Sequence, residues 1–443
     1  MDFVFFSNTG WQTMDGAHRP AQLAKELLRR GHRVLFVELE DSPVKPNTDQ
    51  LRVVGHYALG IGEREMTRAW YGRQYGDLKD WRAGVARALD DFERPDSDGR
   101  AVIWTIPLAP LVELAPLLKG RGYYLIYDCL DDFEGLDSAG YHLYFPEVED
   151  YLVHQSDLLV VLSTSLYEKF RDKTDRIALV RDGIILNDFK DVTPRRTDPA
   201  ALRLGFWGTI TDFMIDCALL ESVAAARPNW QIDLIGPYDV DPLATPVGPR
   251  LKAHPNIHLL GRQPHSALAR HLSNFDACLI PSPVDRFNLG RDPVKTYEYL
   301  AGYRPVVATN LEQLAWMPYV YLARNPSEFI ARIEEAAAVE IDRAVIDQFL
   351  AEQTWACRVD TLLEAVANYP PRASVLPFVQ LPPKKSLAAA QAYIEHLEHE
   401  LAERTALIHK MQGLLAEAGV RPALRRGWKR IRGSMSRARE SKN

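Results

Sequence analysis

The sequence predicts an α/β protein with two doubly wound, Rossmann-like domains that face each other across a cleft, followed by a helical extension. Three observations predict it. Apolar runs of strand length alternate with amphipathic helices, the alternation restarts after a polar, proline-bearing linker at 190–201, and a seven-residue apolar repeat begins near residue 386. The predicted boundaries are 1–190 and 201–335 for the two domains, 336–370 for helices that pack back toward the first domain, 371–385 for a proline-rich linker, 386–419 for a coiled coil and 420–443 for a basic tail.

The first domain is predicted from its buried strands. Apolar runs occur at 2–6, 33–39, 101–106, 123–129, 157–163 and 177–180. They are continuously apolar rather than alternating, which is typical of parallel strands covered on both faces. Between the first two lies the helix pattern AQLAKELLRRGH, where Gly31 ends the helix before the next strand.

The second domain repeats this logic. Strands are expected at 202–208, 230–237, 257–261, 276–282 and 305–309, with a helix from about 215 to 227. Ligands of doubly wound sheets bind beyond the carboxyl ends of the strands, so a site is expected where the two domains face each other. Neither a G-x-G-x-x-G fingerprint after a strand nor a P-loop occurs, which disfavours a dinucleotide dehydrogenase and a P-loop NTPase.

The composition is that of a globular protein, and the cysteine usage favours a reducing, cytoplasmic setting. Its 443 residues are 47% apolar and 25% charged, which is ordinary for globular protein. The four cysteines stand far apart without C-x-x-C spacing, so we expect neither a disulfide framework nor a zinc site. The N-terminus MDFVFFSNTGW lacks a basic region and a cleavage site, and begins like a buried strand instead of a signal peptide.

The C-terminal extension predicts self-association. Leu387, Ile394, Leu401, Ile408 and Leu415 share one heptad position, and a second series follows three residues later at Ala390, Leu397, Arg404, Met411 and Ala418. Nearly five heptads favour a coiled coil and therefore a homo-oligomer formed through residues 387–418. Arg404 at a core position weakens the pattern or sets its register, and a single helix packed on the body is the alternative.

The last segment is strongly basic, whereas the body is acidic. Residues 421–443 hold nine Arg or Lys against one Glu, in a chain whose net charge is -6. On a helix, Leu424, Trp428, Ile431 and Met435 would line up with arginines on the other faces, which suits an anionic membrane surface on the inner face of the membrane. A disordered basic tail or a nucleic-acid contact competes with this interpretation, although the acidic body makes nucleic acid an unexpected partner.

The stretch RDPVKTYEYLAGYRPVV at 291–307 carries the clearest ligand-binding pattern. Pro293 can start a helix and leave the backbone donors of its first turn unpaired, where a phosphate is favoured. Lys295 would add a full positive charge there, and Glu298, one turn on, could accept hydrogen bonds from ribose hydroxyls. The alternative is an exposed Lys295–Glu298 ion pair on a helix surface.

Several motifs together resemble those of the GT-B glycosyltransferases, specifically family-4-like enzymes of bacterial surface polysaccharide synthesis. They are SDLLVVLSTSLYEKF, RDGIILNDF, GFWGTI, NIHLLGRQP and DPVKTYEYLAGYRPVV; the runs HRPAQLAKELLRRGHRVLFVE, IYDCLDDF and TWACRVDTLLEAV are similar to a subgroup assigned to teichuronic acid synthesis. The resemblance covers about residues 1–368. It implies transfer of a sugar from a nucleotide-sugar donor to a saccharide or lipid-linked acceptor in O-antigen, capsule or exopolysaccharide synthesis, with retention and without a metal or other cofactor. The alternatives are a GT-B-shaped scaffold without catalysis and a GT-B-fold nucleotide-sugar epimerase.

The resemblance implies that the second domain binds the donor nucleotide. Its expected contacts are Gly208, Thr209, Gly236, Pro237, Arg262, Pro293, Lys295, Thr296 and Glu298, with Lys295 on the diphosphate and Glu298 on the ribose. The sequence departs from the family pattern twice. Gly290 stands where a glutamate is expected eight positions before Glu298, with Asp292 and Asp285 as the nearest acids. The arginine and lysine expected after the strand at 202–208 are absent, so backbone N–H groups at Gly208 and Thr209 would bind the anion instead, unless Gly208 serves only a tight turn.

The first domain is expected to hold the acceptor and part of the sugar. Asp128, with a catalytic or hydroxyl-binding role, and Asp131 end the strand at 123–129 beside Asp132; a divalent cation on these carboxylates is a less favoured alternative, because their spacing is not D-x-D. Turn or helix-capping roles are also open for Asp131 and Asp132. In the loop after the first strand, Trp11 offers a stacking face, and His18 and Arg19 offer hydrogen-bond donors, with a capping or surface role as the alternative for His18.

Overall fold

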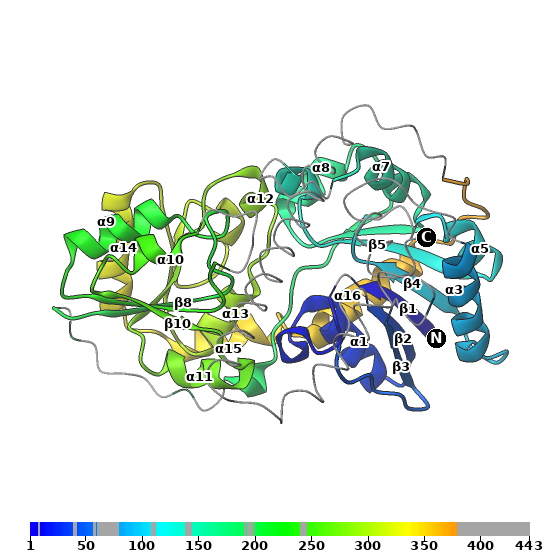
Figure 1. Ribbon diagram of the computed structural model, residues 1–443, viewed down its shortest axis with the longest axis horizontal. Coiled ribbons are helices and arrows are strands. Elements are labelled where there is room, and N and C mark those ends of the chain that lie inside the picture. Colours follow the sequence, from blue (N-terminus) through cyan, green and yellow to red (C-terminus); the bar gives the residue numbers. More distant parts are fainter. Residues whose placement is uncertain are drawn as a thin grey trace, which may run out of the picture. The chain divides into compact units, whose positions relative to one another are not determined.

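The structure is a computed structural model that describes residues 1–7, 9–38, 42–55, 59, 79–107, 112–137, 144–189, 192, 198, 200–239 and 246–378. Residues 1–382 form one compact unit with two parallel sheets (Figure 1). The predicted coiled coil at 386–419 and basic tail at 420–443 lie outside the described residues. Among the helices of the described ranges, none has both the length and the apolar character needed to cross a bilayer.

The first sheet has seven strands in the order β3-β2-β1-β4-β5-β6-β7, all paired in parallel. The strands are β1 (Asp2–Ser7), β2 (Arg33–Glu38), β3 (Leu51–Gly55), β4 (Arg100–Trp104), β5 (Tyr123–Cys129), β6 (Leu158–Val161) and β7 (Ile177–Leu179). Six of them match the predicted apolar runs. The prediction missed β3, a five-residue strand at the sheet edge in which four residues are buried.

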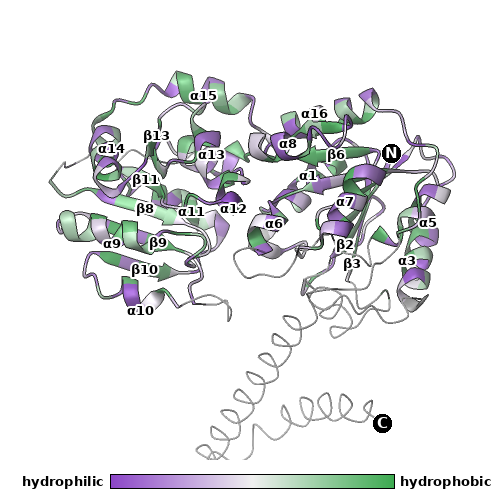
Figure 2. Cartoon of the chain, turned by 90° about the horizontal axis from the view of Figure 1, so that it is seen from above, coloured by the Kyte–Doolittle hydropathy of each residue, from purple (hydrophilic) through white to green (hydrophobic). Residues whose placement is uncertain are grey.

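Helices and short turns of helix surround this sheet. They are η1 (Thr13–Gly16), α1 (Arg19–Arg29), α3 (Lys79–Phe92), α5 (Ala115–Gly120), α6 (Phe133–Leu136), α7 (Pro146–Gln155), α8 (Thr164–Phe170) and η4 (Leu186–Asp188). Apolar side chains pack on both faces of the sheet, in two buried clusters, as continuous apolar strands require. Hydrophobic residues accordingly concentrate along inner strands such as β6 (Figure 2).

The second sheet has six parallel strands in the order β10-β9-β8-β11-β12-β13. They are β8 (Arg203–Trp207), β9 (Gln231–Ile235), β10 (Ile257–Gly261), β11 (Ala277–Ile280), β12 (Val306–Thr309) and β13 (Val320–Ala323). The first five were predicted. The prediction missed β13, which again lies at an edge and has three half-exposed residues of four.

The helices of the second sheet include those that form the site. They are α9 (Cys217–Ala226), α10 (Gly248–Leu251), α11 (His265–Leu272), α12 (Arg286–Leu289), α13 (Val294–Ala301), η5 (Glu312–Leu314) and α14 (Pro326–Ala338). Asp216 caps α9 by accepting from the Leu219 N–H at 2.9 Å, which fixes the start of the helix predicted for this segment. Two apolar clusters again cover the two faces of the sheet.

The last two described helices belong to different cores. Helix α15 (Arg343–Ala351) packs on α13 in the second sheet's core, through Ile346 and Leu350. Helix α16 (Trp355–Asn368) lies beside α1 and contributes Trp355 and Leu362 to the first sheet's core (Figure 1). The chain therefore returns to the first sheet through α16.

The start of the predicted proline-rich linker is held against the first sheet. The Tyr151 hydroxyl donates to the Leu376 carbonyl at 2.6 Å, and the rings of Tyr151 and Phe378 meet edge to face at 5.4 Å. Arg372 bonds to Asp157 through its backbone N–H and to the Ser156 carbonyl through its side chain. Residues up to 378 are thus part of the packed body.

Candidate active site

The strand order places the site on the second sheet. Strands β8 and β11 are neighbours although β9 and β10 come between them in sequence, so the chain reverses its direction of travel across the sheet there. Ligands of doubly wound sheets bind at such a switch point, beyond the carboxyl ends of the strands. The segments that follow β8 and β11 begin with Gly208 and with Pro281, and the second of them leads into α13.

The turns after β8, β9 and β10 are bonded to one another. The Gly208 N–H donates to the Ile235 carbonyl and the Gly236 N–H to the Gly261 carbonyl, each at 2.9 Å, and the Ile210 N–H reaches the Pro237 carbonyl. A Cβ atom at residue 236 would lie 1.9 Å from the Gly208 oxygen, and both glycines have positive φ, so no other residue fits there without rearrangement.

Five predicted nucleotide contacts follow these strands, with mixed outcomes. Gly208 and Gly236 lie side by side, Thr209 and Pro237 are half-buried, and Arg262 is exposed. The Gly208 N–H is already bonded to Ile235, so the predicted use of this donor for an anion is wrong. The alternative prediction, that Gly208 serves a tight turn, fits its positive φ.

Lys295 approaches the turn after β8. Its Nζ atom lies 2.6 Å from where a Cβ on Gly208 would be, so the missing side chain leaves room for the ammonium group. Nζ also lies 4.6 Å from the centre of the Phe206 ring. Burial, with a further contribution from Arg291, lowers the pKa of Lys295 to about 7, against an opposing effect of Glu298.

The helix that carries Lys295 begins at Val294, with Pro293 as its N-cap. The helix therefore starts one residue later than the proline-first prediction, and Lys295 still lies in the first turn. Thr296 and Pro293 are buried. The predicted contact of Thr296 with a nucleotide does not fit this structure, because its side chain has no exposed surface.

Arg291 is a site residue that sequence reasoning missed. Its guanidinium lies 3.1 Å from the Met214 sulfur in the segment after β8 and 3.7 Å from the Asp131 carboxylate. The basic pair expected directly after β8 is absent from the sequence, and the structure brings Arg291 and Lys295, both after β11, to this edge instead. Both cations stand in the motif RDPVKTYE around the start of α13, and this was the available signal.

Glu298 is held inside the fold. Its carboxylate accepts from the Trp207 indole N–H at 2.8 Å and lies 2.9 Å from Nε2 of His265, and the side chain is 9% exposed. This burial rules out the alternative of an exposed ion pair with Lys295. His265, the first residue of α11, was not predicted; its position directly after the strand-end motif GRQP was the available signal.

Arg19 and Asp128 contact each other on the first sheet. Arg19 Nε donates to Asp128 at 3.0 Å and Nη2 at 2.8 Å, with side chains 5% and 2% exposed. Arg19 also donates to the Arg181 carbonyl at 2.9 Å and to Asp182 at 3.2 Å. Both groups were predicted to bind substrate, and the structure instead uses them to join α1, β5 and the segment after β7.

The loop after β1 is fixed by His18 and Trp11. The two ring nitrogens of His18 lie 2.9 Å from Thr9 Oγ1 and 2.8 Å from the Gly10 carbonyl, and the residue is the N-cap of α1 by position without a capping bond from its side chain. Trp11 is half-buried with its ring edge-on to Phe36 at 5.2 Å. Neither side chain stands as an isolated donor or stacking face.

Asp131 and Asp132 differ in their surroundings. Asp132 is buried between Lys169 Nζ at 2.8 Å and Arg286 Nε at 2.6 Å, and although it is the N-cap residue of α6 it makes no capping bond. The side chain of Asp131 is 35% exposed. The burial of the rest of this group, with a smaller contribution from Asp132, raises the pKa of Asp131 to about 6 against the effect of Arg291.

The alternative of a divalent cation site does not fit these carboxylates. Asp128 and Asp132 are each bound to basic side chains, which would compete with a cation for the same oxygens. Among the residues described, no three His, Cys, Asp or Glu side chains are grouped as ligands for a metal.

Gly290 lies where the first sheet's segments contact α12. A Cβ on Gly290 would lie 2.9 Å from the Asp132 Cβ, and the Gly290 carbonyl accepts from Ser163 Oγ at 2.7 Å. The family's glutamate therefore has no space at this position. Asp285, one of the two acids that could have taken the place of this glutamate, instead caps α12 by accepting from the Asn288 N–H.

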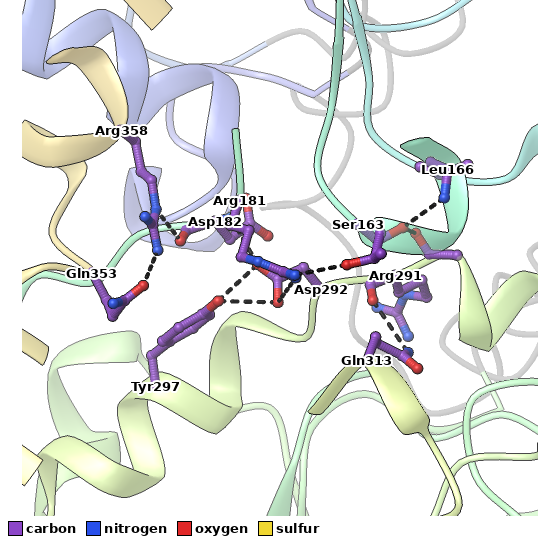
Figure 3. Close-up of polar contacts among 12 residues, drawn as sticks. Ser163, Leu166, Arg181, Asp182, Arg291, Asp292, Tyr297, Gln313, Gln353 and Arg358 are labelled. Atoms are coloured by element: carbon purple, nitrogen blue, oxygen red, sulfur yellow. Dashed lines mark hydrogen bonds and ion pairs between the residues drawn. The ribbon is translucent and has the colours of Figure 1, made fainter. Parts of the chain in front are cut away.

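Asp292, the other substitute, is also occupied, as Figure 3 shows. It accepts from the Asp182 N–H at 2.8 Å and from the Tyr297 hydroxyl at 2.9 Å, and its side chain has no exposed surface. Burial and the neighbouring Asp292 raise the pKa of Asp182 to about 7 against the effect of Arg19. Asp292 thus joins α13 to the segment after β7, and a sugar cannot reach it without opening this contact.

Comparisons with known proteins support the fold. Sucrose-phosphate synthase from Thermosynechococcus elongatus superposes with a TM-score of 0.55 at 16% identity, covering 91% of this chain and 99% of that one. HepE of Anabaena, solved in complex with UDP and glucose, superposes with a TM-score of 0.53 at 13% identity, over 90% and 100% of the two chains. The chain has the GT-B fold.

Sequence comparison adds one relative of this GT-B chain. TuaH of Bacillus subtilis (strain 168), a protein named for glycosyl transfer in teichuronic acid biosynthesis, is 24% identical over 305 residues, which are 62% of this chain and 75% of TuaH. No model of a protein family matches the chain. The predicted resemblance to GT-B glycosyltransferases, and to this subgroup, is confirmed.

Proposed function

We propose that the protein is a glycosyltransferase that moves a sugar from a nucleotide-sugar donor to a saccharide or lipid-linked acceptor in bacterial polysaccharide assembly. The approach of Lys295 to the Gly208 turn at the sheet's switch point carries this proposal. The name of TuaH and the enzymes that share the fold support the reaction class.

The basic groups at this edge suit a diphosphate. Lys295, the N–H groups that begin α13 and Arg291 would bind its oxygens, since charge-assisted hydrogen bonds and helix N-termini both favour anions. As the bond between the sugar and the diphosphate of the donor breaks, negative charge grows on the leaving nucleoside diphosphate, and these groups would stabilise that charge. Lys295 would be the main catalytic residue.

The remaining steps follow from the same arrangement. Glu298, fixed by Trp207 and His265, would accept from ribose hydroxyls with its remaining lone pairs. We propose that the acceptor hydroxyl attacks from the side on which the diphosphate leaves, so that configuration is retained, and that no metal takes part. The acceptor's proton would pass to the departing phosphate.

A donor screen tests the proposal. Purified full-length protein is mixed with UDP-, GDP-, dTDP- and CMP-sugars, and thermal stabilisation and slow donor hydrolysis are measured with and without EDTA. We expect one nucleotide class to stabilise the protein and to be hydrolysed, with EDTA having no effect. Binding without hydrolysis or transfer would favour the inactive scaffold, interconversion of free donors would favour the epimerase, and no response to any donor would overturn the proposal.

We further propose that residues 387–418 form a homo-oligomer and that residues 421–443 bind an anionic membrane, where a lipid-linked acceptor would lie. Light scattering of the full chain tests the first idea, and a monomer at micromolar concentration would overturn it. For the second, liposomes with and without anionic lipid are floated with wild type and with a variant in which Arg425, Arg426, Arg430 and Arg432 are Glu. Equal flotation of the two proteins would overturn membrane binding.

A further inference from the structure

We infer that Asp131, on the first sheet's side, binds hydroxyl groups of the transferred sugar in place of the glutamate that is missing at position 290. This inference rests on the proposed function and specifies how the donor sugar is held. It is carried by the packing at Gly290, by the different surroundings of three neighbouring aspartates, and by the position of Arg291.

Packing explains why the carboxylate cannot come from residue 290. A Cβ there would lie 2.9 Å from the Asp132 Cβ and 3.4 Å from the Asp132 nitrogen, so the chain at 131–132 occupies the space that a side chain would enter. Ser163 holds the Gly290 backbone in place by donating to its carbonyl at 2.7 Å. Because Asp285 and Asp292 are already bonded, a carboxylate near Gly290 would have to come from residues 128–132 at the end of β5.

This segment has three carboxylates, and two of them are already bonded to basic side chains at short distances. Asp128 is paired with Arg19 through two bonds and is almost fully buried. Asp132 lies between Lys169 and Arg286 at 2.8 and 2.6 Å. Asp131 keeps 35% of its side-chain surface, and its carboxylate forms a longer ion pair, 3.7 Å from Arg291 Nε.

Arg291 connects this carboxylate to the proposed diphosphate site. Its Nη1 atom lies 3.1 Å from the Met214 sulfur in the segment after β8, and its Nε atom lies 3.7 Å from the Asp131 carboxylate. Asp131 therefore lies beside a basic group of the proposed diphosphate site, close to where a sugar attached to the diphosphate would be. A partly buried carboxylate gains most from donors that a ligand supplies, and sugar hydroxyls are such donors.

The experiment compares a nucleoside diphosphate with its sugar ester. Full-length wild type, Asp131→Asn and the surface control Asp172→Asn, whose side chain is 93% exposed, are titrated calorimetrically with UDP, GDP, ADP and dTDP, and then with the glucose and galactose esters of whichever binds. We expect Asp131→Asn to bind the nucleoside diphosphate within about twofold of wild type and the sugar ester about 10- to 100-fold more weakly. The Asp172→Asn control should match wild type for both ligands.

Retained nucleoside diphosphate binding shows that Asp131→Asn is folded. If Asp131→Asn does not fold, Asp131→Ser is tested as well. Equal discrimination between diphosphate and sugar ester in wild type and both Asp131 variants would overturn the inference while leaving the proposed function intact. If no nucleoside diphosphate binds wild type, the proposed function fails and the inference fails with it.

Discussion

The start of α13 and the end of β5 each carry charged residues that were predicted to contact substrate, but these residues have different surroundings. At α13, Lys295 faces a turn kept open by Gly208. At β5, Asp128 is bonded twice to Arg19 and buried.

The difference shows that the partners of a charged residue decide its function more than its position at a strand end. An ammonium group that burial has brought to a pKa near 7 lacks the compensation that a bound anion would provide. A carboxylate that already accepts two hydrogen bonds from a guanidinium has little to offer a ligand. Variants on each side can test this contrast.

Removing the Arg19 guanidinium should have the largest effect. In Arg19→Met, Asp128 is left buried without its cation, which typically costs about 3–5 kcal/mol. We expect the free energy of unfolding, measured by urea denaturation, to fall by about this amount. The double variant Arg19→Met/Asp128→Leu should be more stable than Arg19→Met, because it no longer buries an unpaired Asp128 carboxylate, although Asp182 still loses its contact with Arg19.

Asp128→Asn distinguishes a structural role from a substrate-binding one. A structural pair predicts lost stability with nucleoside diphosphate affinity retained in the folded protein. Wild-type stability combined with lost transfer activity would show instead that Asp128 contacts substrate, as the sequence predicted.

Lys295→Met should have the next largest effect. Removing a group that stabilises a leaving diphosphate typically lowers kcat by about 10²- to 10³-fold. We expect a loss of this size in donor hydrolysis, with weaker nucleoside diphosphate binding. Lys173→Met, at an exposed lysine after α8, is the matched control, and equal rates for the two variants would refute the role of Lys295.

The fold was largely predictable, because continuous apolar runs report strands covered on both faces. The edge strands β3 and β13 were missed, although the edge strands β7 and β10, which are no more buried, were predicted from their apolar runs. In the site, Lys295 and Gly208 were both named as nucleotide contacts, but the sequence did not show that the Lys295 ammonium group lies against the Gly208 turn. The Arg19–Asp128 pair and the His265–Glu298 contact join residues 109 and 33 positions apart, and a single sequence does not report which distant charges meet.

Glu298→Ala should weaken nucleotide binding by about 10- to 100-fold if its carboxylate binds ribose, since hydrogen bonds to a charged group contribute about 1.5–3 kcal/mol. The same change leaves Trp207 and His265 without their acceptor, so affinity alone is ambiguous. Calorimetry with the nucleoside diphosphate and its 2′,3′-dideoxy analogue resolves this. A ribose contact predicts that wild type prefers the ribose form and that Glu298→Ala does not, whereas an unchanged preference would show that Glu298 only supports the packing of α11 and β8.

The smallest expected effect is a pH dependence of diphosphate binding. Because the pKa of Lys295 is lowered to about 7, its ammonium form is lost as the pH rises through 7, and an anion should bind more weakly above that point. We expect nucleoside diphosphate affinity to fall several-fold, and by at most about tenfold per pH unit, between about pH 7 and pH 8.5. Lys295→Met should show a flat profile over this range, where the diphosphate itself stays ionised. An equally steep profile in this variant would assign the titration to another group and would remove Lys295 as the source of the contrast with Asp128.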